Sequence, residues 1–260
     1  MLKTLTKTVL LACIPWTVFA QDILHATEPN HLGLANTGLS LESPFSLGHN
    51  PALLSQSSNL ELATSISNRY GIKNLNYFIL EAHTRHKTKG LGLRLEQLHT
   101  KHYSRTVSTV GIGVPINSKL QLGVSITNII TKITESSTSL QLFYQAGATF
   151  SPKDKLTVSA AWKSDYSEQH QLSLGSAFSV SEAFTMIIEH LNNTNTTSWK
   201  IASMYGFNKT ITLLSGFDLQ NRTFHFGINL QTKSLTFLFG CGIGQPLGMD
   251  SATGITYSND

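Results

Sequence analysis

Residues 223–230 read Thr-Phe-His-Phe-Gly-Ile-Asn-Leu, and apolar and polar side chains alternate along the whole stretch. Residues 235–243, Leu-Thr-Phe-Leu-Phe-Gly-Cys-Gly-Ile, repeat the pattern with mostly glycine and threonine on the second face. A β-strand places successive side chains on opposite faces, so a period of two predicts strands with one apolar and one small or polar face. Such strands suit a membrane barrel whose apolar face contacts lipid and whose polar face lines a wet or loosely filled lumen.

The alternation continues from about residue 60 to residue 257 and divides into fourteen segments. An even number of strands is typical of single-chain bacterial barrels, and tilted strands of about 9–11 residues cross a bilayer. The sequence therefore predicts an all-β fold, a transmembrane antiparallel up-and-down barrel of about fourteen strands. The predicted strands are Leu60–Ser67, Leu75–His83, Gly90–Leu98, Thr106–Pro115, Leu120–Ile130, Ser139–Phe150, Leu156–Lys163, Gln171–Val180, Ala183–His190, Ser198–Phe207, Ile211–Leu219, Thr223–Leu230, Leu235–Ile243 and Ala252–Tyr257.

The connections between these segments alternate in length. Every second one is tight and built from turn-forming residues, as at 117–119, 151–155, 208–210 and 232–234. The others are longer and more polar. Short periplasmic turns and longer outer loops are typical of bacterial barrels, so both ends of the predicted barrel lie on the periplasmic side.

The first twenty residues are typical of an export signal, with two lysines before an apolar stretch at residues 9–19. Residues 18–20 form a small-residue cleavage site that ends at Ala20. We therefore expect a bacterial signal peptide that is cleaved after Ala20 during export to the outer membrane. A lipoprotein signal ending at Cys13 is the alternative. Cleavage after Ala20 leaves Cys241 as the one cysteine, which excludes a disulfide framework and a thiolate metal site.

Charged residues make up only 13% of the chain, against about 25% in a typical soluble domain. A soluble β-sandwich or jelly roll also alternates, but its solvent-facing side usually carries lysine and glutamate. The scarcity of charge therefore favours a barrel with outer-membrane lipids as its partners. The net charge of +4 is spread along the chain without a basic stripe, so no nucleic acid is implied as a partner.

Residues 21–59 differ from the rest because they contain three prolines and no sustained alternation. We expect three parts: a signal peptide at 1–20, an irregular N-terminal plug at 21–59 and the barrel at 60–260. A plug of this kind would lie against the polar inner faces of the strands.

The stretch from Gly38 to Leu54 contains Asn50-Pro51-Ala52 directly before the first predicted strand. It resembles the N-terminal segment of the FadL/PorV-like outer-membrane proteins, and residues 245–257 resemble the last hairpin of the PorV branch. The resemblance implies a barrel of about fourteen strands with a segment packed inside it, and it implies that the Asn-Pro-Ala motif forms the turn that anchors this plug. The short loops imply that the outer loops with which fatty-acid transporters capture ligands are trimmed.

A set of ionisable side chains falls on the lumen face of the predicted strands. Such groups usually pair with one another or with an inserted plug, and the alternative is a role in selecting the solute. The set comprises Arg94, Glu96, Glu189, Lys200, Asp218 and His225.

Two histidine pairs, at residues 83–86 and 99–102, invite a metal site. Strand geometry argues against one, because the pairs lie far apart and a spacing of three sends two rings to opposite faces. We interpret these histidines as basic rim residues near lipid headgroups. We predict no catalytic residue, metal site or cofactor, because the chain carries no nucleophile elbow, HExxH motif or phosphate loop.

We therefore predict a plugged outer-membrane barrel for the passive passage of hydrophobic or small solutes, and no enzyme. The alternative implied by the PorV resemblance is a barrel that does not transport and instead docks secretion-machinery proteins or proteins for surface attachment. A third hypothesis, a barrel enzyme acting on lipid, requires a serine or histidine at the lipid-facing rim with an acidic partner.

Overall fold

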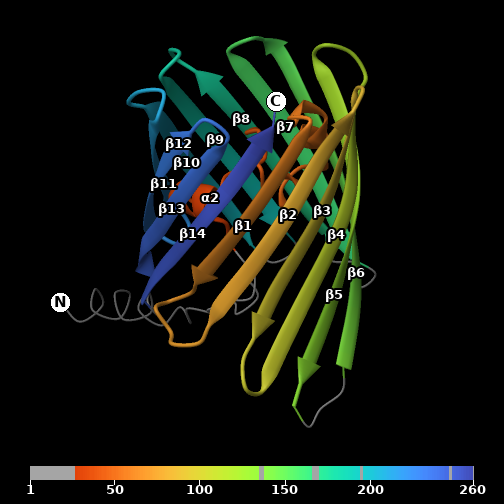
Figure 1. The fold of residues 1–260 in the computed structure, drawn as a ribbon, viewed down its shortest axis with the longest axis vertical. Coiled ribbons are helices and arrows are strands. Elements are labelled where there is room, and N and C mark those ends of the chain that lie inside the picture. The colour runs from red at the N-terminus through yellow and green to blue at the C-terminus, as the bar shows by residue number, and fades with distance from the viewer. Residues whose placement is uncertain (1–26, 135–137, 166–169, 194–195, 246–247, 260) are drawn as a thin grey trace, which may run out of the picture.

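The computed structural model describes residues 27–134, 138–165, 170–193, 196–245 and 248–259, which form a closed antiparallel β-barrel (Figure 1). Each strand pairs with the next along the chain, and β1 closes the barrel on β14. The strands are β1 Leu60–Asn68, β2 Asn76–His86, β3 Lys89–His99, β4 Tyr103–Pro115, β5 Leu120–Ile133, β6 Thr138–Lys153, β7 Leu156–Asp165, β8 His170–Ser179, β9 Phe184–Asn193, β10 Thr197–Gly206, β11 Ile211–Asp218, β12 Thr223–Thr232, β13 Leu235–Gln245 and β14 Gly248–Asn259.

This architecture confirms the predicted fourteen-stranded barrel, and the alternative fold of a soluble β-sandwich or jelly roll is wrong. The predicted boundaries lie within a few residues of the observed ones, apart from β14, which begins at Gly248 instead of Ala252. The predicted signal peptide, its cleavage after Ala20 and the alternative at Cys13 lie outside the described residues. Among the described residues, no helix is both long and apolar enough to span a bilayer.

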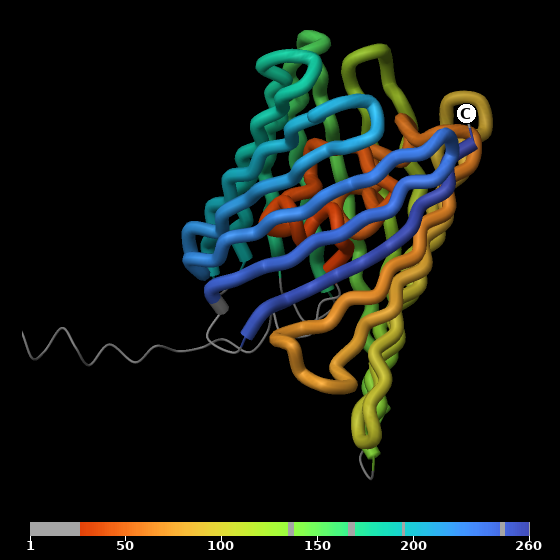
Figure 2. The backbone as a smooth tube through the Cα atoms, turned by 60° about the vertical axis from the view of Figure 1, so that its left-hand side comes forward, coloured from red at the N-terminus to blue at the C-terminus, as the bar shows by residue number. Residues whose placement is uncertain are grey.

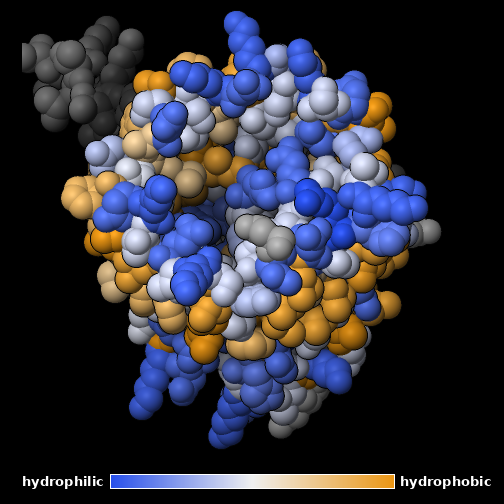
Figure 3. Space-filling model, turned by 45° about the horizontal axis from the view of Figure 1, so that its top comes forward, coloured by the Kyte–Doolittle hydropathy of each residue, from blue (hydrophilic) through white to orange (hydrophobic). Residues whose placement is uncertain are grey.

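The two faces of the wall differ as the alternation predicts. On β12, Phe224 and Phe226 are 61% and 45% exposed on the outside, while Thr223 and His225 are buried on the inside. On the face shown in Figure 3, apolar side chains form a band across the wall between hydrophilic ends. The band fits the hydrocarbon layer of a bilayer.

The two ends of the barrel are different. The start of β1 and the end of β14 lie at one end, which we call the terminal rim. Connections of two to four residues join strands at both ends, except for the seven residues between β1 and β2 at the opposite end, so the predicted contrast in loop length is small. The opposite end is the loop rim. There β5 and β6, with 14 and 16 residues, extend the wall beyond their neighbours (Figure 1).

Residues 27–59, which we call the inner segment, lie within the barrel (Figure 2). The inner segment contains α2 Pro29–Gly33, η2 Ser46–Gly48 and η3 Pro51–Gln56, and most of its residues are buried. Pro51 begins η3, where its missing N–H leaves no helical hydrogen bond unmade, and the Asn50 side chain caps the turn by accepting a hydrogen bond from the Ala52 N–H.

Four glycines form a row across the wall, each directly opposite the next on the neighbouring strand. A Cβ atom at any of them would overlap the inner segment around η3, so the absent side chains let the two backbones approach closely. The expectation of a wet or loosely filled lumen is wrong here, because glycine makes room for packed protein instead of solvent. We call this set the glycine row; it comprises Gly90, Gly113, Gly123 and Gly147.

A charge on the lipid face should destabilise the barrel. Ile126 lies midway along β5 and is 47% exposed on the outer face. Replacing it with arginine is expected to cost about 2–4 kcal/mol of unfolding free energy, because arginine at the bilayer midplane loses its hydration. Urea unfolding in phospholipid vesicles measures the change. Thr138→Arg, at the loop rim end of β6, should cost no more than about 1 kcal/mol, and equal costs would contradict the assigned membrane position.

Candidate functional site

A cluster of ionisable side chains joins the inner segment to the inside of β1, β2 and β3. We call it the anchor cluster. Some of its members lie on the strands that span residues 60–99, and the others lie in turns of the inner segment. These residues are far apart in the sequence, so only the folded barrel brings them together. It comprises Glu28, His31 and His49 of the inner segment and Glu61, Glu81, His83, Arg94 and Glu96 of the wall.

Arg94 is the centre of this cluster. Its side chain is 3% exposed and faces three carboxylates. Nη1 lies 2.8 Å from Oε2 of Glu81 and also contacts Oε1 of Glu28, while Nε donates to Oε1 of Glu96 at 2.6 Å. A guanidinium presents several donors in a fixed plane, so one residue can tie the inner segment to two strands.

His83 lies between two carboxylates of the wall. Its Nε2 is 2.6 Å from Oε1 of Glu81, and its Nδ1 is 3.5 Å from Oε2 of Glu61. The interpretation of His83 as a rim residue is therefore wrong, because β2 carries it into the lumen with its side chain buried. His86, His99 and His102 are exposed.

Glu28 is shared between the wall and the inner segment itself. Its Oε2 lies 3.1 Å from Nδ1 of His31 and 3.3 Å from Nε2 of His49. Burial would raise the pKa of Glu28, but Arg94 and the two histidines hold that pKa well below its usual range. Burial, reinforced by the neighbouring His49, lowers the pKa of His31, so this imidazole is neutral near pH 7.

The wall also binds the backbone of the inner segment at separate points. Oε2 of Glu189 accepts hydrogen bonds from the N–H groups of Gly38 and Leu39, at 3.0 and 3.2 Å. Oε1 of Glu81 accepts one from the Leu47 N–H at 3.0 Å, and the Gln145 side chain donates to the His49 carbonyl at 2.6 Å. Buried N–H and C=O groups need such partners because no water reaches them.

Asn50 of the predicted Asn-Pro-Ala motif links the inner segment to β6. Its Nδ2 donates to the Leu39 carbonyl and to Oγ1 of Thr149, both at 2.9 Å. Pro51 and Ala52 follow it in η3, against the glycine row. The motif therefore lies at a point where three parts of the chain meet.

The remaining predicted lumen residues lie apart from the anchor cluster. Lys200 is opposite Glu189 on β9 and Asp218 on β11. Asp218 accepts hydrogen bonds from the backbone N–H groups of residues 220 and 221 and so shapes a turn at the loop rim. His225 is buried and lies 2.8 Å from the Thr223 hydroxyl. Of the six predicted residues, Arg94 and Glu96 are joined by a side-chain hydrogen bond, and Lys200 lies opposite Glu189 and Asp218 on the neighbouring strands.

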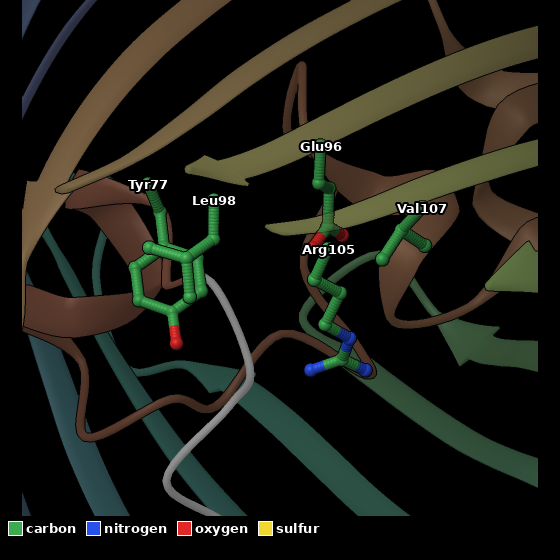
Figure 4. A pocket seen from close by; sticks show the side chains of 5 residues that line it. All are labelled: Tyr77, Glu96, Leu98, Arg105 and Val107. Atoms are coloured by element: carbon green, nitrogen blue, oxygen red, sulfur yellow. The ribbon is translucent and has the colours of Figure 1, made fainter. Parts of the chain in front are cut away.

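Next to the anchor cluster, on the side of the loop rim, five side chains of β2, β3 and β4 line a narrow crevice (Figure 4). The crevice as it stands has no room for a water molecule. Its lining is mixed, since three residues present apolar surface and two carry charge, and Glu96 belongs to both the crevice and the anchor cluster. The lining residues are Tyr77, Glu96, Leu98, Arg105 and Val107.

Similarity in structure is clear although similarity in sequence is low. No family model matches the chain, and no curated protein matches it by sequence. The chain superposes on the CymD monoaromatic hydrocarbon channel with a TM-score of 0.71, over 90% of this chain and 98% of that one, at 11% identity. The chain has the fold of the FadL-like outer-membrane barrels.

Two further barrels of this FadL-like kind are similar over the same 90% of the chain. The Pseudomonas putida toluene transporter TodX gives a TM-score of 0.67 at 12% identity, with 96% of its chain covered. A Pseudomonas aeruginosa FadL homologue gives 0.63 at 11% identity, with 99% of its chain covered. These matches confirm the predicted resemblance to FadL-like barrels.

Sequence reasoning missed most of the anchor cluster. The inner face of β1 and β2 carries Glu61, Glu81 and His83 once the register of these strands is set. The alternation in the sequence was therefore enough to assign these three residues to the lumen. Glu28, His31 and His49 carried no such signal, because they lie in irregular backbone whose path depends on the barrel around it.

Proposed function

We propose that this chain is a bacterial outer-membrane barrel that passes small hydrophobic solutes passively, with the inner segment as its plug. Export would follow cleavage after Ala20. The observation that carries the proposal is the closed barrel, with an apolar outer face and with the inner segment packed inside it. The fold similarity to hydrocarbon channels and to a FadL homologue supports it.

Once its side chains move apart, the crevice would offer a hydrophobic solute a first contact on the loop rim side. Tyr77, Leu98 and Val107 would cover the apolar body of such a solute, and burying this surface favours binding by about 25 cal/mol per Å². Because the crevice is closed as it stands, its side chains must move to admit a solute. Arg105 and Glu96 border the same space, so a solute with a polar end would find hydrogen-bonding partners there.

The plug closes the direct route through the lumen. Hydrogen bonds and ion pairs attach the plug to several strands, and the charged residues of the anchor cluster lie on one side of the plug. We therefore place the route of the solute along the wall formed by β2, β3 and β4. Opening this route requires only that side chains move, which disrupts less of the packed interior than removing the whole plug would.

Filling the crevice should stop transport. Val107→Trp adds a large side chain at a buried position of the lining, so uptake of radiolabelled toluene by cells of a host without its own hydrocarbon channels is expected to fall to the level of cells without the protein. Val110→Trp is the matched control, because Val110 is on the same strand but faces outward and is 54% exposed. Unchanged uptake in a Val107→Trp barrel that shows normal heat-dependent gel mobility would contradict the proposal.

The second candidate is the docking role that the PorV resemblance implies. The extension of β5 and β6 beyond the loop rim favours it, because Ile133 and Leu140 are 49% and 69% exposed there. A stoichiometric protein partner after mild detergent extraction, without solute uptake, is the result that this candidate predicts.

A further inference from the structure

We propose that Glu28, His31 and His49 form a binding site for a divalent transition-metal ion of the zinc type inside the plug. These three side chains each bring one ligand atom into a group whose members all lie within 4.8 Å of one another. Two imidazoles and one carboxylate are a common zinc ligand set, with a solvent or solute molecule in the fourth position.

The separation of the ligand atoms fits a small tetrahedral ion. Bonds of about 2.0–2.1 Å to zinc place neighbouring tetrahedral ligands roughly 3.3 Å apart. Oε2 of Glu28 is 3.1 Å from Nδ1 of His31 and 3.3 Å from Nε2 of His49, so two of the three edges already have this length. The two rings lie close, with centroids 3.9 Å apart, and their ligand atoms lie within 4.8 Å of each other.

The carboxylate of Glu28 can serve the ion and the anchor cluster together. Its Oε1 contacts Arg94, whereas both histidines approach Oε2. An ion on Oε2 therefore leaves the contact between the plug and β3 in place.

Glu28 supplies the negative charge that a cation needs at this site. Its carboxylate lies beside the two imidazoles in a buried position, where the low dielectric strengthens the attraction between the carboxylate and a divalent ion. His49 keeps 22% of its side chain exposed, which gives an ion a way in.

The test is a titration of the purified, chelator-treated barrel in detergent with Co²⁺, whose visible absorption reports tetrahedral coordination, followed by displacement with Zn²⁺. We expect one saturable site in the wild-type protein. His49→Gln should weaken binding by more than the roughly 10–100-fold that loss of an outer-shell partner costs. His102→Gln, at an exposed histidine between β3 and β4, should bind like the wild type.

Heat-dependent gel mobility checks that His49→Gln remains a folded barrel. If that variant binds Co²⁺ as the wild type does, the assigned ligands are wrong. If the folded wild-type protein shows no saturable tetrahedral site, the proposal fails whatever the variants do.

Discussion

Replacing Arg94 with alanine is expected to destabilise the folded protein by about 3–5 kcal/mol, because removing one partner of a buried ion pair leaves uncompensated charge. Three carboxylates, from Glu28, Glu81 and Glu96, would lose their shared cation in a largely buried region. The plug should also leave the wall of β3, since the contact between Arg94 and Glu28 crosses that boundary. Urea unfolding in phospholipid vesicles measures the loss of stability, and limited proteolysis reports release of the plug.

The matched control is Arg85→Ala, at an exposed position near the end of β2. Its cost should be within about 0.5 kcal/mol of zero, as for most surface substitutions. Arg94→Lys should recover part of the loss, because it restores the charge without the planar set of donors. If Arg94→Ala unfolds like Arg85→Ala, the anchor cluster does not hold the plug.

Adding a side chain to the glycine row should open the lumen. A Cβ at Gly123 would overlap the peptide between Pro51 and Ala52, so Gly123→Val cannot keep η3 in its place. Overpacking of this kind costs about 1–3 kcal/mol, which corresponds to a roughly 5–150-fold larger population of the unseated plug. Single-channel recording in planar bilayers should show larger and more frequent polar conductance than the wild-type barrel does.

Gly206→Val controls for the added side chain itself. Gly206 lies in β10 near the terminal rim, and the nearest atom to a Cβ there is 3.8 Å away, which is ordinary contact. This variant should conduct like the wild type. Equal conductance in the Gly123 and Gly206 variants would show that the inner segment does not close the barrel.

The wall could be predicted from the sequence because each strand reports its own register. Along β12 and β13 the alternation separates lipid-facing phenylalanines from inward residues with no knowledge of the neighbours. The start of β14 was the least accurately predicted boundary, because Gly248 and the residues after it do not continue the alternation of apolar and polar side chains. The Asn50-Pro51-Ala52 motif was found by resemblance, and the structure adds the contacts that its side chains make.

The interior could not be predicted in the same way. The small and polar residues of the second strand face predicted a wet or loosely filled lumen, because a period of two does not distinguish space for water from space for another backbone. Nothing local marks Glu28 as a partner of Arg94, which lies 66 residues away in the numbering, or His49 as a partner of Glu28, which lies 21 residues away. Such contacts depend on the path of the irregular inner segment, and the fourteen strands packed around it determine that path.

The proposed function is tested most directly by solute uptake with the unaltered protein. Cells of a bacterial host that lacks its own hydrophobic-solute channels would produce the full chain, and their uptake of radiolabelled toluene would be compared with that of cells carrying an empty vector. We predict faster uptake with the protein, with no matching rise for a polar sugar of similar size. Equal uptake in the two strains, with the folded barrel demonstrated in the outer membrane, would contradict a hydrophobic-solute channel.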